Sequence, residues 1–104
     1  MQLVEKPYGV PTEDPPPKIK NGEEAVEVAI KGRLHYDVLN CHRTATPTEI
    51  KACYRRMALM LHPDKNPDEQ AAVAFKRVSD AWEALSSPLA RAEYDAGLDN
   101  AFEE

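Results

Sequence analysis

The chain has 104 residues and a formal net charge of −5, with 42% hydrophobic and 30% charged residues. These values fit one small globular domain and argue against a nucleic-acid or membrane-surface binder. No apolar run is long enough to cross a bilayer, and the N-terminus has no apolar segment of the kind found in secretory signals. We therefore expect a cytoplasmic protein.

Composition divides the chain into four parts. Five of its nine prolines fall within the first 17 residues, and such a stretch forms neither a helix nor a central strand. We expect a flexible proline-rich leader over 1–20; a proline-rich ligand for a partner domain is the alternative interpretation. A short helix or linker over 21–33, a folded domain over 34–98 and an acidic tail over 99–104 should follow.

Residues 21–33 allow two interpretations. Asn21 is suited to cap a short helix, and Gly32 is suited to follow its end. The same stretch also alternates apolar residues as a strand would, at Val26, Val28 and Ile30. Because no second strand candidate lies nearby, we predict the helix.

The folded domain begins with a short apolar segment, for which we predict a helix over about 35–39. Tyr36 and Leu39 would face a core. Asn40 is suited to a left-handed conformation at the end of this helix.

The clearest predicted element is an amphipathic helix over 47–61. Thr46 and Glu49 have the spacing of a capping box, and Pro47 occupies the first helical position. Pro63 disfavours helical dihedrals at His62, which predicts that the helix ends there. Its apolar stripe consists of Ile50, Cys53, Tyr54, Met57, Ala58 and Leu61.

Two more helices are predicted beyond this one. The first runs over about 68–85, and the second is short, over about 88–96, and is ended by Gly97. Two long helices joined by a short loop should pack as an antiparallel hairpin with the short helices over its ends. The expected fold is therefore all-α. The stripe of the 68–85 helix consists of Phe75, Val78, Trp82 and Leu85, with Ala71, Ala74 and Ala81 beside them.

The solvent side of the 47–61 helix carries Lys51, Arg55 and Arg56, which we call the basic face. A local basic face on an acidic chain suggests an acidic protein partner; an ordinary solvated helix face is the alternative. Leu59 projects from the same side, where it is a candidate apolar anchor of a docking surface.

His62, Pro63 and Asp64 form a rigid polar loop at the tip of the predicted hairpin. A catalytic role is disfavoured, because the side chains of His62 and Asp64 should diverge on a tight turn and no serine lies nearby. An aspartate held by prolines loses little entropy on docking and accepts a bidentate hydrogen bond from a partner's arginine. We expect a recognition loop and no enzyme activity.

The chain has two cysteines, Cys41 and Cys53. Even with His42 and His62, their spacing lacks the close ligand pairs of known zinc sites. Two free, partly buried thiols are the favoured interpretation, ahead of a zinc site or a disulfide. We expect no metal and no cofactor.

The stretch from Leu34 to Gly97 resembles the J domain of DnaJ-type co-chaperones. HYDVLN is similar to the family's opening motif, and TPTEIKACYRRMALMLHPDKNP is similar to its second helix and HPD motif. AFKRVSDAWEALSSPLARAEYD is similar to its third and fourth helices. The resemblance implies the J-domain fold. It also implies binding to the ATPase domain and interdomain linker of a DnaK-type heat-shock chaperone, whose ATP hydrolysis it would stimulate; we expect a monomer.

The resemblance implies which residues bind the chaperone. The HPD motif would be the trigger, with Asp64 pairing with an arginine near the interdomain linker, and the basic face would contact acidic chaperone surface. Further matched positions support the loop or extend the contact. With Leu59 added, the expected chaperone-binding residues are His62, Pro63, Asp64, Lys51, Tyr54, Arg55, Arg56, Leu59, Lys65, Asn66, Phe75 and Lys76.

The sequence also departs from the family pattern. Ala52, Met60 and Leu61 stand where the family often has basic or aromatic residues, so the docking face is less charged than usual. This sequence has no glycine- and phenylalanine-rich region and no cysteine-rich zinc module after the J-like stretch. We therefore expect either a J-domain-only protein or an excised domain of a larger protein.

Two alternative functions remain. The main one is a J-like adaptor or scaffold subunit without ATPase stimulation, which the intact HPD motif disfavours. The second is a helical DNA binder, which the net charge of −5 opposes.

Overall fold

The computed structural model describes residues 18–102, which contain five α-helices and no strand. The expected leader up to residue 17 and the last two residues of the acidic tail lie outside the described residues. The all-α prediction is confirmed. The helices are α1 (Gly22–Lys31), α2 (His35–Leu39), α3 (Pro47–Leu61), α4 (Ala71–Leu85) and α5 (Pro88–Phe102).

The stretch with two interpretations is a helix, α1, and its predicted start is confirmed. The Asn21 side chain accepts a hydrogen bond from the backbone N–H of Glu24 at 2.9 Å. This bond satisfies one of the donors that have no partner within the helix. Ala25, Val26 and Ala29 are buried, so α1 is part of the core and not a linker.

Helix α2 follows the prediction closely. Tyr36 and Leu39 are buried, and so is Val38, which was not predicted as a core residue. Asn40 ends the helix in the left-handed conformation, with φ 60 and ψ 49. Asparagine tolerates this region better than most residues that carry a Cβ atom.

Helix α3 has the predicted bounds because the local signals at both ends are strong. The Thr46 hydroxyl accepts from the N–H of Glu49 at 3.1 Å, and the Glu49 carboxylate accepts from the N–H of Thr46 at 2.9 Å. This reciprocal pair is the predicted capping box. Ile50, Met57 and Leu61 are buried along the helix.

Helix α4 begins at Ala71, three residues later than predicted. The Asn66 side chain accepts from the N–H of Asp68 at 3.0 Å, and the Asp68 side chain accepts from the N–H of Gln70 at 2.7 Å. Such local bonds from side chain to backbone compete with the helical pattern. They delay the start of α4.

The core face of α4 is also rotated from its predicted position. Ala74, Val78 and Ala81 are fully buried, whereas the larger Phe75 and Trp82 are only half-buried. Helix α4 contacts α1, α2, α3 and α5. Small side chains on the central face let these neighbours approach closely, so the aromatic rings lie at its edges.

Helix α5 does not end at Gly97, and the predicted short helix over 88–96 is wrong in length. Beyond Gly97, Leu98 packs half-buried against the core and the Asp99 carboxylate pairs with Arg43 at 2.8 Å. These contacts offset the roughly 1 kcal/mol by which glycine disfavours a helix interior. The start of the expected acidic tail is therefore helical.

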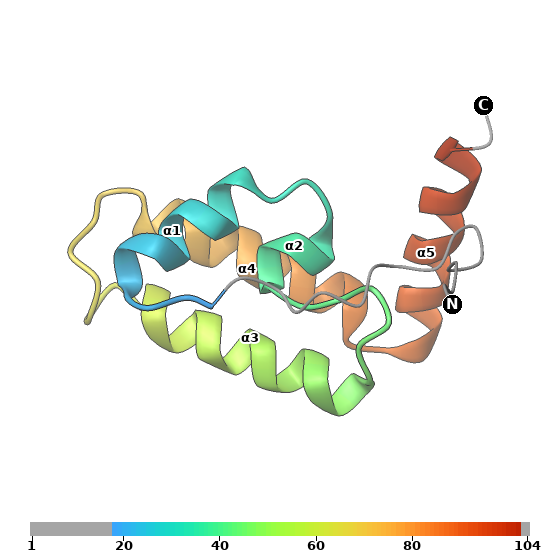
Figure 1. Ribbon diagram of the computed structural model, residues 1–104, viewed down its shortest axis with the longest axis horizontal. Helices are drawn as coiled ribbons and strands as arrows, with labels where there is room; N and C mark the ends of the chain where they lie inside the picture. The colour runs from blue at the N-terminus through green and yellow to red at the C-terminus, as the bar shows by residue number, and fades with distance from the viewer. Residues whose placement is uncertain (1–17, 103–104) are drawn as a thin grey trace, which may run out of the picture.

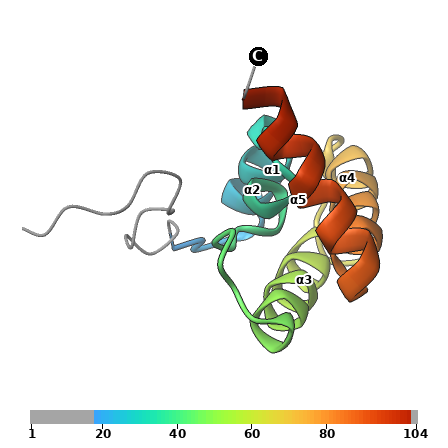
Figure 2. The ribbon, with the colours of Figure 1, turned by 90° about the vertical axis from the view of Figure 1, so that its right-hand side faces the viewer.

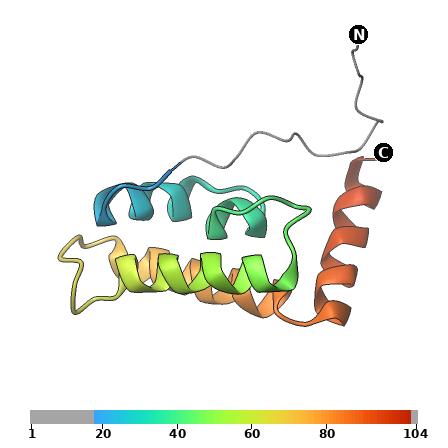
Figure 3. The ribbon, with the colours of Figure 1, turned by 60° about the horizontal axis from the view of Figure 1, so that its bottom comes forward.

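The five helices form two layers and a cross-piece. Helices α3 and α4 lie side by side and are joined at one end by the loop of residues 62–70 (Figures 1 and 3). Helices α1 and α2 cover one face of this pair, although α2 was expected at its end. Only α5 lies at an end, opposite the loop, where it crosses the others in the end-on view of Figure 2.

A network of polar side chains holds α5 in place. The Tyr36 hydroxyl donates to the Asp95 carboxylate at 2.7 Å and accepts from Arg91 Nε at 3.0 Å. The Tyr94 hydroxyl accepts from the backbone N–H of His35 at 2.9 Å. These bonds join α2 to α5 across more than fifty residues of chain.

None of the helices in residues 18–102 combines the length and the apolar character that a bilayer crossing requires.

Candidate functional site

The loop of residues 62–70, which we call the HPD loop, forms the free end of the α3–α4 pair (Figure 1). His62 has φ −59 and ψ 130, an extended conformation that ends α3 where the following proline was predicted to end it. The backbone N–H groups of Lys65 and Asn66 both donate to the carbonyl of His62 at 2.9 Å. The first part of the loop is therefore a tight, hydrogen-bonded turn.

The turn brings His62 and Asp64 together, so the expectation that their side chains diverge is wrong. The backbone N–H of Asp64 donates to His62 Nδ1 at 3.1 Å, and Nδ1 lies 3.7 Å from Asp64 Oδ2. The turn at Pro63 places residue 64 at the Nδ1 edge of the ring. The Asp64 side chain nevertheless remains 88% exposed, with its carboxylate open to a partner.

The other side of the His62 ring rests on α4. The rings of His62 and Phe75 meet edge to face, with centroids 5.9 Å apart and an interplanar angle of 88°. Aromatic pairs favour this geometry because the ring edge is positive and the ring face negative. Phe75 of α4 therefore supports the loop through the His62 ring. The neighbouring Lys76 is exposed and pairs with Asp80 on the same helix at 3.2 Å.

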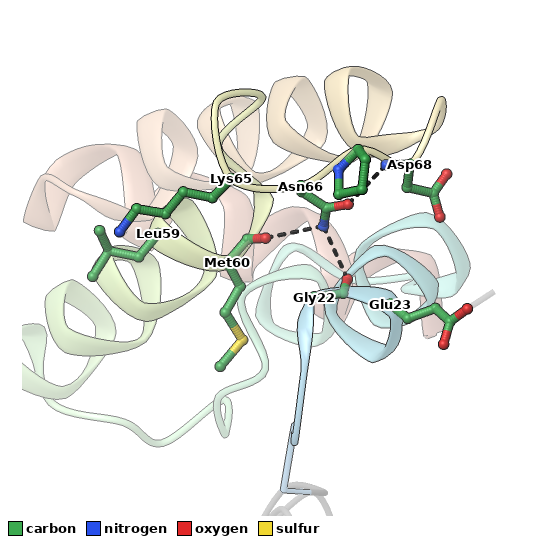
Figure 4. Close-up of a pocket in the computed structure, with 8 residues that line it drawn as sticks. Gly22, Glu23, Leu59, Met60, Lys65, Asn66 and Asp68 are labelled. Carbon is green, nitrogen blue, oxygen red and sulfur yellow. Dashed lines mark hydrogen bonds between the residues drawn. The ribbon is translucent and has the colours of Figure 1, made fainter.

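Asn66 is the one buried polar residue of the described chain, with 8% of its surface exposed. Its side-chain nitrogen donates to the carbonyls of Met60 at 3.0 Å and Gly22 at 3.2 Å, as Figure 4 shows. Its side-chain oxygen accepts from the N–H of Asp68. Of the two roles expected for Asn66, loop support and surface contact, this geometry fits loop support.

The basic face has the exposure that the helical pattern predicts. Lys51, Arg55 and Arg56 are exposed on α3, and Leu59 is 61% exposed beside them. Tyr54 is half-buried and stacks on Trp82 of α4, with centroids 4.7 Å apart and an interplanar angle of 12°. One side of α3 therefore presents three cations along the helix and an apolar side chain in the last turn, close to the HPD loop.

Two residues with structural influence on this region were not predicted. Arg77 of α4 donates from Nε to the carbonyl of Ala29 and from a terminal nitrogen to the carbonyl of Gly32, both at 2.7 Å. Gly22 lies against the HPD loop, where α1, α3 and the loop border a groove of about 550 Å³. No local pattern marks either residue, because their partners lie more than forty residues away in the chain.

The cysteines are both free thiols, Cys41 buried and Cys53 half-buried. A hydrogen bond with the Cys41 thiol lowers the pKa of Cys53, and Arg56 acts in the same direction. The same hydrogen bond, together with burial, raises the pKa of Cys41. Within residues 18–102, no three side chains of the metal-binding types come together as a candidate metal site.

Known proteins are similar in sequence to the folded region of this chain. The model of the DnaJ domain family matches residues 34–95. The chaperone protein DnaJ of Leifsonia xyli is 52% identical over 63 residues, which are 61% of this chain and 17% of that protein. The human DnaJ homolog subfamily A member 4 is 47% identical over 75 residues, which are 72% of this chain and 18% of that protein.

A third relative gives a similar coverage. The chaperone protein DnaJ of Chlamydia abortus is 51% identical over 70 residues, which are 65% of this chain and 18% of that protein. The chain thus spans less than a fifth of the length of these relatives. Because the family model covers more than half of the chain, from α2 into α5, the chain belongs to the DnaJ domain family and residues 34–95 form its J domain.

Proposed function

We propose that this chain binds the ATPase domain and interdomain linker of a DnaK-type heat-shock chaperone and stimulates its ATP hydrolysis through the HPD loop. The observation that carries the proposal is the Asp64 carboxylate, which is 88% exposed on a hydrogen-bonded turn. Two relatives are named chaperone protein DnaJ, which supports a chaperone role.

The docking surface we propose combines the HPD loop with one side of α3. Asp64 would accept a bidentate hydrogen bond from a chaperone arginine, because such pairs are stronger than neutral hydrogen bonds. The basic face would lie against acidic chaperone surface, with Leu59 as an apolar contact among the cations. Lys65 and Lys76, both exposed, would extend the contact.

The remaining proposed residues act from beneath this surface. Phe75 holds the His62 ring edge to face, and Tyr54 fixes α3 against Trp82. Both side chains are half-buried, so each keeps some surface available to a partner.

The test is single-turnover ATP hydrolysis by a DnaK-type chaperone, with the wild-type chain and with Asp64→Asn. The substitution removes the charge and one acceptor at nearly constant volume, so we expect stimulation to fall by about 10- to 100-fold. The control is Glu93→Gln, which also removes one negative charge. Glu93 is exposed on α5, at the far end of the molecule, so this substitution should leave stimulation unchanged.

Equal stimulation by wild type and Asp64→Asn would refute the trigger role. Binding of the wild-type chain without any stimulation would instead favour the adaptor or scaffold alternative.

A further inference from the structure

Helix α1 lies outside residues 34–95, yet it is built into the J domain. Its buried side chains Ala25 and Ala29 have no exposed surface. At the C-terminal end of α1, the carbonyls of Ala29 and Gly32 both accept hydrogen bonds from Arg77 of α4. A helix with a buried face and such a charged, two-point attachment has a fixed position against α4.

The other end of α1 meets the HPD loop. Asn66 joins three segments there, because it binds the carbonyl of Gly22 in α1, the carbonyl of Met60 in α3 and the N–H of Asp68 before α4. The carbonyl of Met60 belongs to the last turn of α3, where carbonyls have no partner within the helix. The Asn66 amide supplies that partner, and it does so while held by α1 (Figure 4).

The approach of α1 to the loop leaves no room for a side chain at Gly22. A Cβ atom at this position would lie 2.7 Å from Asn66 Nδ2 and 3.2 Å from the Met60 carbonyl oxygen. The first of these distances is shorter than any ordinary contact, so a methyl group there must displace the Asn66 amide. Since that amide carries three hydrogen bonds, its displacement would release the loop from both α1 and α3.

We propose that α1 acts through Asn66 as an internal support that holds the HPD loop in its docking conformation, with Asn66 as a positioning residue. This inference rests on the proposed function. A loop that is already ordered before docking loses less conformational freedom when the partner binds. The support therefore lowers the concentration at which the chain engages its chaperone, whereas Asp64 determines the rate once it is engaged.

Gly22→Ala tests this directly, because alanine is the better helix former, so a defect must come from the close contacts with the Asn66 amide and the Met60 carbonyl that it binds. Asn66→Ala removes the amide without steric pressure and decides the outcome if Gly22→Ala fails to fold. Gly97→Ala is the matched control, since it is also a helical glycine and a Cβ atom there would meet nothing within 4 Å.

The main readout is the single-turnover assay, titrated with each variant to separate half-saturation from maximal stimulation. We expect Gly22→Ala and Asn66→Ala to raise the half-saturating concentration about two- to tenfold with the maximal rate kept. Gly97→Ala should match wild type. A lowered maximal rate at unchanged half-saturation, or no change in either quantity, would overturn the inference.

A second readout uses no chaperone, so its failure is separate from that of the proposed function. The amide protons of Lys65 and Asn66, which bind the His62 carbonyl, should exchange faster in both variants than in wild type, while amides in the middle of α4 keep their wild-type rates. Unchanged exchange at these two amides would show that α1 does not support the loop. Faster exchange in a chain whose wild type gives no stimulation would instead refute only the proposed function.

Discussion

The side chains of the HPD loop divide into those that face out and those that face in. Asp64 is almost fully exposed, although its backbone N–H is bound to His62. Asn66, two positions further, is buried, and its side-chain nitrogen donates two hydrogen bonds. A loop of this kind combines a fixed backbone with a free carboxylate, which is the arrangement that a rigid recognition element needs.

Leu59 offers a prediction about a single side chain. It is 61% exposed beside the basic face, so it contributes little to the core. We expect Leu59→Ala to weaken chaperone binding by about 1 kcal/mol or more, as truncation of an interface anchor does, with the melting temperature unchanged. Binding titrations and thermal unfolding measure the two effects.

Leu89→Ala is the control for this prediction, because Leu89 is 70% exposed on α5 at the other end of the molecule. It should affect neither quantity. A large fall in melting temperature for Leu59→Ala would show that Leu59 stabilises the fold and would argue against a docking role.

The helices differ in how their positions are secured. Helix α3 relies on its capping box and apolar stripe, whereas α5 has few buried apolar residues and depends on hydrogen bonds to Tyr36, His35 and Arg43. Arg91 contributes twice, through the Tyr36 hydroxyl and through the Arg43 carbonyl at 2.8 Å. The attachment of α5 should therefore be sensitive to the protonation state of these groups.

Tyr36 makes this sensitivity measurable. Its burial, and next its hydrogen bond to Asp95, raise the pKa of the phenol from 10.0 to about 12. Between these values the folded state keeps a proton that the unfolded state releases, so stability is complete below pH 10 and falls as the pH rises toward 12. The expected slope is up to about 1.4 kcal/mol per pH unit.

Urea unfolding between neutral pH and pH 11 measures this slope. Tyr36→Phe keeps the ring and removes the titrating group, so its free energy of unfolding should be lower at neutral pH and decline less at alkaline pH. The comparison isolates the contribution of Tyr36, because every other residue is the same in the two proteins. Identical slopes would rule out Tyr36 as the group responsible.

At the scale of the whole molecule, the two ends carry different features. The HPD loop lies at one end and α5 with its polar network lies at the other (Figure 3), and the basic face lies along α3 between them. The net charge is −5, yet the basic face of α3 carries three exposed cations. Long-range attraction to an acidic partner must therefore come from a local field and not from the total charge.

This arrangement predicts a salt dependence. The basic face is exposed, and charges in water are screened beyond a Debye length of about 10 Å at 0.1 M salt. The half-saturating concentration for ATPase stimulation should rise as ionic strength increases. Replacing Lys51, Arg55 and Arg56 together by glutamine should raise it at low salt and flatten the dependence. A wild-type response that is indifferent to salt would exclude the basic face from the contact.

Most of the fold could be predicted from short-range patterns. The start of α1 at Asn21, the capping box of α3 and the break at His62 are confirmed, because each depends on residues within four positions of one another. The exposed positions of Leu59 and the basic face followed from the helical period of α3. These predictions needed no knowledge of which helix packs on which.

What could not be predicted depends on contacts between residues far apart in the chain. Helix α5 continues through Gly97 because Leu98 and Asp99 find partners on other elements, and the weak local preference of glycine to end a helix is overcome. Asn66 faces inward because the carbonyl of Gly22, 44 positions away, lies within hydrogen-bonding distance. Local chemistry thus determined where α1 and α3 begin and where α3 ends. Packing decided how far α5 extends and which elements support the loop, since burial and long-range hydrogen bonds exist only after the chain has folded.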